Sequence, residues 1–551
     1  MCVTHRYACS WWAAVQRGGR LTFFPGRIPA GSPAVRVLAA TAWGVAILCL
    51  LPLVYLFVRT LQIGPGIARI LGRARIWQVG GNSVALTLAV TASAVCVGTS
   101  LAWLTTRTDL RGRRFWSAVT SLPLVLPSYV GAFALIAALG PNGMLQAVLA
   151  PLGVERLPSI YGFPGAWLAL TLFTYPYVQL SVRAGLRGLD PGQEEAARSL
   201  GLSSTQVMWR VVLPHLRPSI AAGALLVALY TLSDFGAVAL LQFNAFTREI
   251  YVQYTAALDR SAAAVLGVML VGLTLLILRG EYHLRGRGVH YRSGPGTARR
   301  QPVVALGRWQ GLACGWCALV TLLALGVPLL VIGYWLVQPA SVANPWAGVW
   351  GQTMNSVSAA GVAAVTAVIA AFPVMVYSVR RPGRSSRWAE RCGYLGHALP
   401  GVVVALALVF LGARHVPRLY QTGPLLILAY VILFLPLALG PLRAALLNLS
   451  PRLEEAAAAL GATPLRILRT ITLPSVRPGV WLGLALVFLT VMKELPATLI
   501  LGPTGFHTLA TRIWGATEEA LFTHAAPSAL ILVVVSAWSL WIILQQEESV
   551  R

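Results

Sequence analysis

Long apolar runs separated by short polar segments dominate the pattern of this chain. An apolar run of about 18 residues or more is a candidate membrane span, because roughly 20 helical residues cross the hydrocarbon core of a bilayer. Twelve such runs lie at about 37–58, 83–105, 117–139, 165–182, 219–241, 261–278, 312–336, 354–378, 394–413, 424–440, 479–501 and 525–544. Backbone groups in lipid must be satisfied within the segment, so each run is predicted to be a helix. The pattern predicts an all-α integral membrane protein with about twelve transmembrane helices.

The two halves of the chain repeat one another. The segment LDPGQEEAARSLGLSSTQVMWRVVLPHLRPSI at 189–220 aligns without gaps to LSPRLEEAAAALGATPLRILRTITLPSVRPGV at 449–480, with 12 identities in 32 positions. Farther upstream, Asn82-Ser83-Val84 matches Asn355-Ser356-Val357. Each half contains six apolar runs, an even number that returns the chain to its starting side. We therefore expect two parallel six-helix repeats related by an axis along the membrane normal.

The repeat divides the chain into four segments. We expect a basic cytoplasmic tail at 1–36, a first six-span repeat at 37–279, a cytoplasmic connector rich in glycine and arginine at 280–311, and a second six-span repeat at 312–545. With 57% hydrophobic and 11% charged residues, the 551-residue chain is too apolar for the soluble class. Its seven cysteines predict no disulfide framework, and Cys314-Gly-Trp-Cys317 is better interpreted as small buried residues than as a metal or redox site.

The net charge of +26 raises the question of nucleic acid binding, which the distribution of the charge answers. If the N-terminus is cytoplasmic, 32 of the arginines fall in cytoplasmic segments and ten in external ones. This bias is the positive-inside rule, which orients the protein and places both termini in the cytoplasm. We therefore expect no nucleic acid partner. The arginines of the connector are expected to be solvated and to contact the anionic headgroups of membrane lipid.

An eight-residue phrase occurs at the same place in each repeat, between the fourth and fifth expected spans. It reads EEAARSLG from Glu194 to Gly201 and EEAAAALG from Glu454 to Gly461. A capping residue followed by proline precedes each phrase and predicts the start of a helix. The acids then fall in the first turns, where the helix dipole favours negative charge, and the glycine ends the helix. The capping pairs are Asp190-Pro191 and Ser450-Pro451.

A second short helix is expected after each glycine. It begins at Ser203 or Ser204 in the first repeat and at Thr463-Pro464 in the second, and Leu213-Pro214 and Leu473-Pro474 are expected to end it. The product is a helix–glycine–helix elbow on the cytoplasmic side. For one copy, a linker that packs on its own spans is an equally good interpretation. Two copies at equivalent places favour a docking surface for a two-fold or pseudo-two-fold partner.

The pattern Glu-Ala-Ala, three residues, glycine and then Leu-Pro resembles the cytoplasmic EAA loop of binding-protein-dependent ABC importer permeases. The resemblance covers about residues 40–545. Phrases similar to the fused twelve-span permeases of the iron(III) importer group are LPLVLPSYVGAFAL, LSDFGAVALL, TREIYVQYTAALDR, KELPATLIL and GFHTLATRIW. The resemblance implies the MetI-like fold of type I importers, in the cytoplasmic (inner) membrane of a prokaryote.

In that family the loop fits a cleft on the ATPase subunit and transmits closure of the ATPase dimer to the transmembrane helices. Carried over by position, the ATPase-coupling residues implied are Glu194, Glu195, Ala196, Ala197 and Gly201 with Glu454, Glu455, Ala456, Ala457 and Gly461. The implied partners are two copies of an ABC ATPase at the cytoplasmic face and an extracytoplasmic solute-binding protein, and no cofactor is implied. Ala458 stands where the first copy has Arg198, which leaves open whether the two ATPase contacts are equal.

The chain is not expected to hydrolyse ATP itself. A P-loop needs a lysine followed by serine or threonine, and the only lysine, Lys493, is followed by Glu494. Energy must come from a separate subunit or from an ion gradient. A gradient-driven secondary transporter is therefore the alternative class, although such a transporter would have no need of two elbows.

The fifth expected span of each repeat carries an acid, Asp234 in LSDFG and Glu494 in MKELP. A charge near the bilayer centre costs roughly 2.5–3.5 kcal/mol on insertion scales, so each acid needs a reason. One interpretation is that the acids, with Lys493, line a shared translocation pathway for a cationic or metal-bearing solute. The other is local neutralisation, by Lys493 beside Glu494 and by hydrogen bonds between spans at Asp234. The residues leave both open.

The solute is favoured by the resemblance alone. Iron(III) is the first candidate, and thiamine, sulfate or polyamines, which related permeases carry, are not excluded. His507 and His524, expected outside near Glu518 and Glu519, have the residue types of a metal site. External residues of this kind are more often solvated or in contact with a solute-binding protein, so no metal site is expected.

Overall fold

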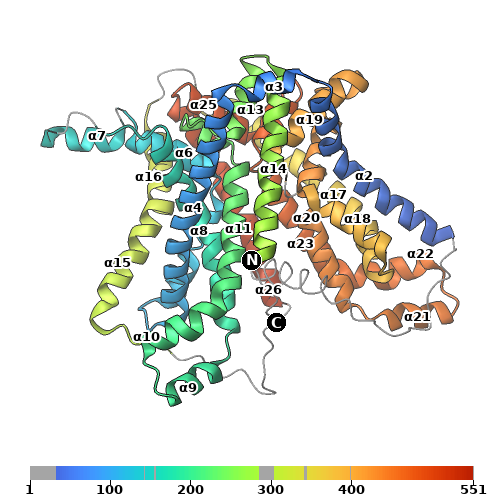
Figure 1. Ribbon diagram of the computed structural model, residues 1–551, viewed down its shortest axis with the longest axis horizontal. Coiled ribbons are helices and arrows are strands. Elements are labelled where there is room, and N and C mark those ends of the chain that lie inside the picture. Colours follow the sequence, from blue (N-terminus) through green and yellow to red (C-terminus); the bar gives the residue numbers. More distant parts are fainter. Residues whose placement is uncertain are drawn as a thin grey trace. The chain divides into compact units, whose positions relative to one another are not determined.

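The computed structural model describes residues 33–141, 143–153, 157–284, 303–339, 344–396 and 399–549, which are mostly helical (Figure 1). The expected tail at 1–36 and the expected connector at 280–311 lie largely outside the described residues. The chain forms two compact units. Unit 1 contains Met1–Pro65, Trp346–Ile513 and Ser528–Arg551, and unit 2 contains Gly66–Pro345 and Trp514–Pro527.

Unit 2 is built around three long helices, α4, α8 and α11, which pack against one another. The helix α14 packs on α11, and the short helix α13 packs on α14. The helices of unit 2 are α3 (Gly66–Leu71), α4 (Ala74–Arg107), α5 (Arg113–Val119), α6 (Ser128–Leu139), α7 (Met144–Leu149), α8 (Phe163–Gly188), α9 (Pro191–Ser199), α10 (Ser204–Val207), α11 (Leu213–Ser233), α12 (Gly236–Leu240), α13 (Phe246–Thr255), α14 (Arg260–Leu284), α15 (Gln310–Thr321) and α16 (Val327–Val337).

Unit 1 has an equivalent centre, in which α17, α20 and α23 pack against one another. Its helices are α2 (Pro33–Leu61), α17 (Val349–Arg380), α18 (Arg384–Leu395), α19 (Gly401–His415), α20 (Gly423–Asn448), α21 (Pro451–Ala459), α22 (Pro464–Ile467), α23 (Leu473–Val491) and α24 (Pro496–Leu501). Two further helices, α25 (Leu509–Glu518) and α26 (Phe522–Ser549), begin in one unit and end in the other.

The first helix of each sequence repeat packs in the unit built mainly from the other repeat. The helix α2 contacts α17, α18 and α19 in unit 1, where Trp43 donates a hydrogen bond to Ser385 (2.9 Å). The helix α16 contacts α6 in unit 2, and Trp316 of α15 donates to Ser100 of α4 (3.0 Å). The compact units therefore differ from the sequence halves by an exchange of first helices.

Ten helices of the described residues are long and apolar enough to cross a membrane, which confirms the multi-pass prediction. The two other expected spans, 165–182 and 394–413, fall on α8, which has 26 residues, and largely on α19, which has 15. In α8 two polar side chains, those of Tyr175 and Gln179, are buried in unit 2. Tyr175 donates to the carbonyl of Thr120 (2.7 Å), and Gln179 donates to the hydroxyl of the same residue (2.6 Å).

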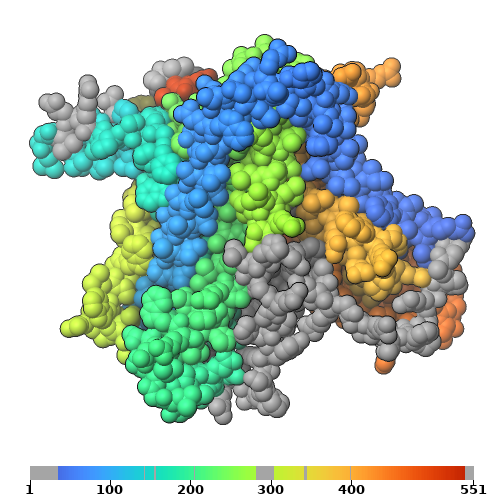
Figure 2. All heavy atoms as spheres, viewed as in Figure 1, coloured from blue at the N-terminus to red at the C-terminus, as the bar shows by residue number. Residues whose placement is uncertain are grey.

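Each repeat places its elbow at one end of a unit. In unit 2 the helices α9 and α10 lie at the opposite end from α3 and α13, and in unit 1 α21 and α22 lie at the opposite end from α19 (Figure 1). The atoms of the α9 end (green, lower left) are uncovered on the face shown in Figure 2.

Candidate coupling loops and buried acids

The first helix of each elbow begins and ends as the sequence predicts. Asp190 precedes α9 and its side chain accepts a hydrogen bond from the backbone N–H of Gly192 (3.1 Å). Ser450 is at the same place before α21, but its side chain forms no capping hydrogen bond there, contrary to the predicted capping role. Proline follows in both, and an acid occupies each first turn. These confirm the predicted helix starts.

Both first helices end in a Schellman motif. In α9, Gly201 N–H donates to the carbonyl of Arg198 (2.9 Å) and Leu202 N–H to that of Ala197 (3.2 Å). The equivalent bonds of the second elbow are 3.0 Å each, from Gly461 to Ala458 and from Ala462 to Ala457. Gly201 and Gly461 have φ of +86° and +82°, a conformation that side chains other than hydrogen disfavour.

The tips of the elbows expose apolar side chains. Leu460 and Leu200 are 89% and 84% exposed, the highest values among the large apolar side chains of the described residues. They occupy equivalent positions, directly before the two glycines. Exposed apolar side chains of this size at the end of a membrane protein indicate a binding surface.

The structure separates the two acids of each phrase. Glu194 is 3% exposed and forms an ion pair with Arg107, and Glu454 forms the equivalent pair with Arg380 (2.9 Å). The second acid, Glu195, is exposed, as are Ala196 and Gly201, whereas Ala197 is buried. In the second phrase Ala456 and Gly461 are exposed, and Glu455 and Ala457 are half-buried.

The sequence predicted that the second helix of each elbow ends at the Leu-Pro pair, and this prediction is wrong. It continues through a π-helical segment, η3 (Met208–Val212) or η8 (Leu468–Thr472), directly into α11 or α23. The wider π turn precedes the proline, which then stands in the first turn of the following α-helical segment, where its missing N–H is tolerated. The second helix of each elbow and the fifth span of its repeat therefore form one helical rod.

The prediction that Asp234 lies inside a continuous fifth span is wrong. The helix α11 ends at Ser233, and after a break of two residues the short helix α12 begins at Gly236. One carboxylate oxygen of Asp234 accepts from the backbone N–H of Ala237 (2.9 Å), and the Ser128 hydroxyl donates to the other. The acid caps a helix start, and Thr247 donates to its carbonyl (2.6 Å).

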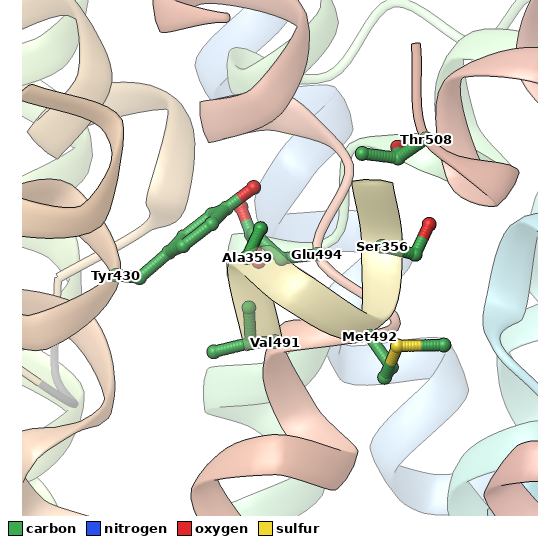
Figure 3. A pocket seen from close by; sticks show the side chains of 7 residues that line it. All are labelled: Ser356, Ala359, Tyr430, Val491, Met492, Glu494 and Thr508. Carbon is green, nitrogen blue, oxygen red and sulfur yellow. The ribbon is translucent and has the colours of Figure 1, made fainter. Parts of the chain in front are cut away.

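Glu494 has the same role in unit 1, at the break between α23 and α24. Its Oε1 accepts from the N–H of Ala497 (3.1 Å), and its carbonyl accepts from the hydroxyl of Thr498 (2.9 Å). A small cavity adjoins the carboxylate (Figure 3). Its lining is formed by Ser356, Ala359, Tyr430, Val491, Met492, Glu494 and Thr508. Lys493 lies half-buried in the turn of the same break.

The two acids belong to different units, so a pathway shared by Asp234, Lys493 and Glu494 stays a prediction. In each unit, the capping of a helix break explains why an acid is present at this position. Hydrogen bonds between segments satisfy Asp234, as the alternative interpretation predicted.

The Asn-Ser match between the repeats has a structural role that the sequence did not predict. In unit 2, Asn82 donates to the carbonyl of Asn244 (3.1 Å), and Ser83 accepts from the N–H of Phe246 (2.9 Å). In unit 1 the equivalent donor reaches the carbonyl of His507 (3.0 Å), and the serine accepts from Leu509 (2.9 Å). The second span of each repeat thus holds the start of α13 or α25. The occurrence of Asn-Ser at equivalent places of the two repeats was the sequence signal that could have indicated this role.

Two of the arginines expected outside the membrane have acidic partners in unit 2. Arg73 pairs with Asp259 (3.1 Å), and Arg75 donates twice to Glu249 (2.9 and 3.0 Å). Burial alone raises the pKa of Glu249, but hydrogen bonds from Arg75 and Gln253 outweigh it and hold the pKa below its usual value.

Sequence comparison identifies relatives of both repeats. Residues 94–287 and 363–547 each match the sequence model of the family described as binding-protein-dependent transport system inner membrane component. The Fe(3+)-transport system permease protein FbpB 2 of Haemophilus influenzae is 35% identical over 494 residues, which cover 89% of this chain and 94% of that protein. The ferric transport system permease protein FbpB of Actinobacillus pleuropneumoniae is 25% identical, with 85% and 71% covered.

A solved structure gives a weaker match. A bacterial ABC transporter involved in the import of the acidic polysaccharide alginate aligns with a TM-score of 0.38 and 16% identity, over 45% of this chain and 95% of that chain.

Proposed function

The chain belongs to the binding-protein-dependent transport system inner membrane components, and on this premise we propose that it is the fused permease of an ABC importer for iron(III). The permease receives its solute from an extracytoplasmic binding protein and is driven by two copies of a separate ATPase. Both termini lie in the cytoplasm, as the arginine distribution favours.

The observation that carries the proposal is the pair of matching elbow tips. Each presents an apolar side chain, Leu200 or Leu460, beside a glycine with positive φ. The short helix that follows each glycine continues through a π-helical segment into the fifth span. Two equivalent tips fit a motor that has two equivalent subunits. The rods give a push at the tip a direct mechanical route to α11 and α23.

The sequence supports a separate ATPase subunit. The chain has one lysine, Lys493, followed by Glu494, so it has no lysine that could serve a P-loop. We assign hydrolysis to the partner and translocation to this chain.

Iron(III) is supported by the names of relatives that cover most of the chain. Relatives named for sulfate or molybdenum match about a third of it, such as the sulfate transport system permease protein CysW of Synechocystis, at 31% identity over 33% of the chain. A substrate inferred over both repeats is better supported than one inferred over a single repeat.

Docking is tested by co-purification of the ATPase with the full-length chain. Leu200→Glu and Leu460→Glu should each weaken retention of the ATPase, and the double variant should abolish it, because a charge replaces the apolar contact. Leu152→Glu is the matched control, since this leucine is 76% exposed and lies away from the elbows. If the double variant retained the ATPase like the unmodified chain, the docking assignment would be wrong.

Transport is tested in lipid vesicles that contain the permease, its ATPase and its binding protein. Radioactive iron(III) on the binding protein should enter only with ATP, and sulfate, thiamine or spermidine should not compete. Uptake that persists without ATP and stops with an ionophore would instead support the gradient-driven alternative. Competition by one of the other solutes would keep the ABC assignment and change the substrate.

A further inference from the structure

Each elbow is joined to the second span of its repeat by an ion pair at two helix ends. Arg107 is the last residue of α4, and its partner Glu194 is in the first turn of α9. Arg380 is the last residue of α17, and its partner Glu454 is in the first turn of α21. A helix dipole favours a cation at its C-terminus and an anion at its N-terminus, so all four charges lie where their own helices stabilise them.

The pair in unit 2 is completely enclosed. The side chains of Arg107 and Glu194 are 2% and 4% exposed. A charge that loses its partner in such a place is left without water or a counter-charge, which is strongly unfavourable. The end of α4 and the start of α9 are therefore held together while the pair is intact.

The pair in unit 1 is more accessible and has additional partners. Arg380 and Glu454 are 16% and 20% exposed. Arg380 also donates to the carbonyl of Leu449 (3.3 and 3.4 Å), just before α21, and Glu454 accepts from the hydroxyl of Thr472 in η8 (2.7 Å). This pair joins three parts of unit 1, namely α17, α21 and the base of the rod.

The described end of the connector braces the first pair. Val304 donates to the carbonyl of Arg107 (2.8 Å), Asp109 N–H donates to the carbonyl of Val304 (3.2 Å), and Leu306 N–H donates to the Asp109 side chain (2.8 Å). The position equivalent to Asp109 in the second repeat is Pro382, which has no N–H to offer. The two links therefore differ in burial and in bracing.

We propose that Arg107 and Arg380 are positioning residues that transmit movement of the elbows to α4 and α17, the second span of each repeat. The inference rests on the proposed function, in which an ATPase moves the elbows. Each elbow then acts on two spans at once, on the fifth through the continuous rod and on the second through the ion pair. The first acid of each phrase holds the elbow to the membrane helices, and the exposed parts of the tip face the ATPase.

The test uses the full permease with its ATPase and its binding protein in vesicles. Arg107→Gln, Glu194→Gln and the double variant are compared for ATPase retention, ATP hydrolysis and uptake of radioactive iron(III). We expect the ATPase to stay bound and the uptake per ATP hydrolysed to fall about fivefold to tenfold in each single variant. The double variant should fall no further, because one link is lost in all three. Arg113→Gln, which removes an exposed arginine six residues along, is the control.

Arg380→Gln keeps the proposal testable if the buried position does not tolerate substitution, with Arg384→Gln as its control. It should lower uptake per ATP by a smaller factor, since its pair is partly exposed. Unchanged uptake per ATP in folded Arg107→Gln and Arg380→Gln, or effects of Arg107→Gln and Glu194→Gln that multiply in the double variant, would overturn the proposal. Failure of the unmodified chain to retain any ATPase would overturn the proposed function instead.

Discussion

Gly401 lies against Glu494 so closely that a Cβ added to the glycine would come within 2.7 Å of the carboxylate. The equivalent positions of the first repeat hold Ser128 and Asp234, and there the serine donates a hydrogen bond to the acid. A short acid with serine and a longer acid with glycine thus serve the same helix break in the two units. The pairing explains why the repeats differ at both positions together.

Gly401→Ser should therefore lower the thermal unfolding midpoint of the purified protein, because overpacking of this kind costs about 1–3 kcal/mol. Adding Glu494→Asp should recover most of the loss, since the shorter acid makes room for the hydroxyl and accepts its hydrogen bond. Gly361→Ser is the control, because a Cβ there meets nothing within 4 Å. Equal unfolding midpoints for the single and double variants would contradict the proposed matching of serine with aspartate and of glycine with glutamate.

Replacement of Asp234 separates its two interpretations. Asp234→Ala removes the cap of α12 and should reduce stability by about 1 kcal/mol or more, seen as a lower yield of folded protein. Asp234→Asn keeps an acceptor for Ala237 and should preserve folding. If the charge serves a pathway, the Asn variant also loses iron(III) uptake with its ATPase still bound, and Glu494→Gln should behave alike. Normal uptake in folded Asn and Gln variants would restrict both acids to capping.

The glycines of the elbows offer a test of backbone geometry. Gly201→Ala and Gly461→Ala should destabilise the tips by about 1–2 kcal/mol, because φ is positive at both positions although space is open around them. ATPase retention should fall in each variant, and Gly201→Asn should fall less, since asparagine tolerates this conformation better. Gly192→Ala, inside α9, is the control and should be neutral or stabilising. Full retention in both Ala variants would show that tip shape is unimportant.

Stability should fall in mild acid through the carboxylate of Glu249. Its pKa is depressed in the folded protein, so the folded state gains stability above the unfolded pKa of about 4.3 and loses it as the pH falls through the lower, folded value. Unfolding midpoints measured from pH 7 to pH 3 should therefore drop less steeply in Glu249→Gln than in the unmodified chain. Identical slopes would mean that the Arg75 pair contributes no linkage.

Local sequence signals are sufficient to predict the elbows. Asp190-Pro191 starts a helix and Gly201 ends it through interactions within a few residues, so the neighbouring sequence is enough to predict both ends. The prediction that Leu213-Pro214 ends a helix is wrong because the backbone hydrogen bonding changes before the proline. A proline ends a helix only if the helix must keep its regular hydrogen bonds, and the π-helical η3 changes that pattern just before it.

Partners distant in sequence could not be predicted. The break at Asp234 lies in an apolar run, and it is held by Ser128, 106 positions earlier. In the sequence, Arg107 is one of many arginines that follow the positive-inside rule. Only the fold brings it into contact with Glu194. The offset that relates Asn82 to Asn355 also relates Arg107 to Arg380, but an offset does not show what either arginine binds.

The exchange of first helices has a consequence for synthesis of the protein. The helix α2 is synthesised before every other described helix. It packs against α17, α18 and α19, which are translated only after Gly66–Pro345. Until then α2 has lipid for a neighbour in place of those helices. In a nascent chain that stops before α17, the helix α2 therefore lacks the helices on which it packs in the complete protein.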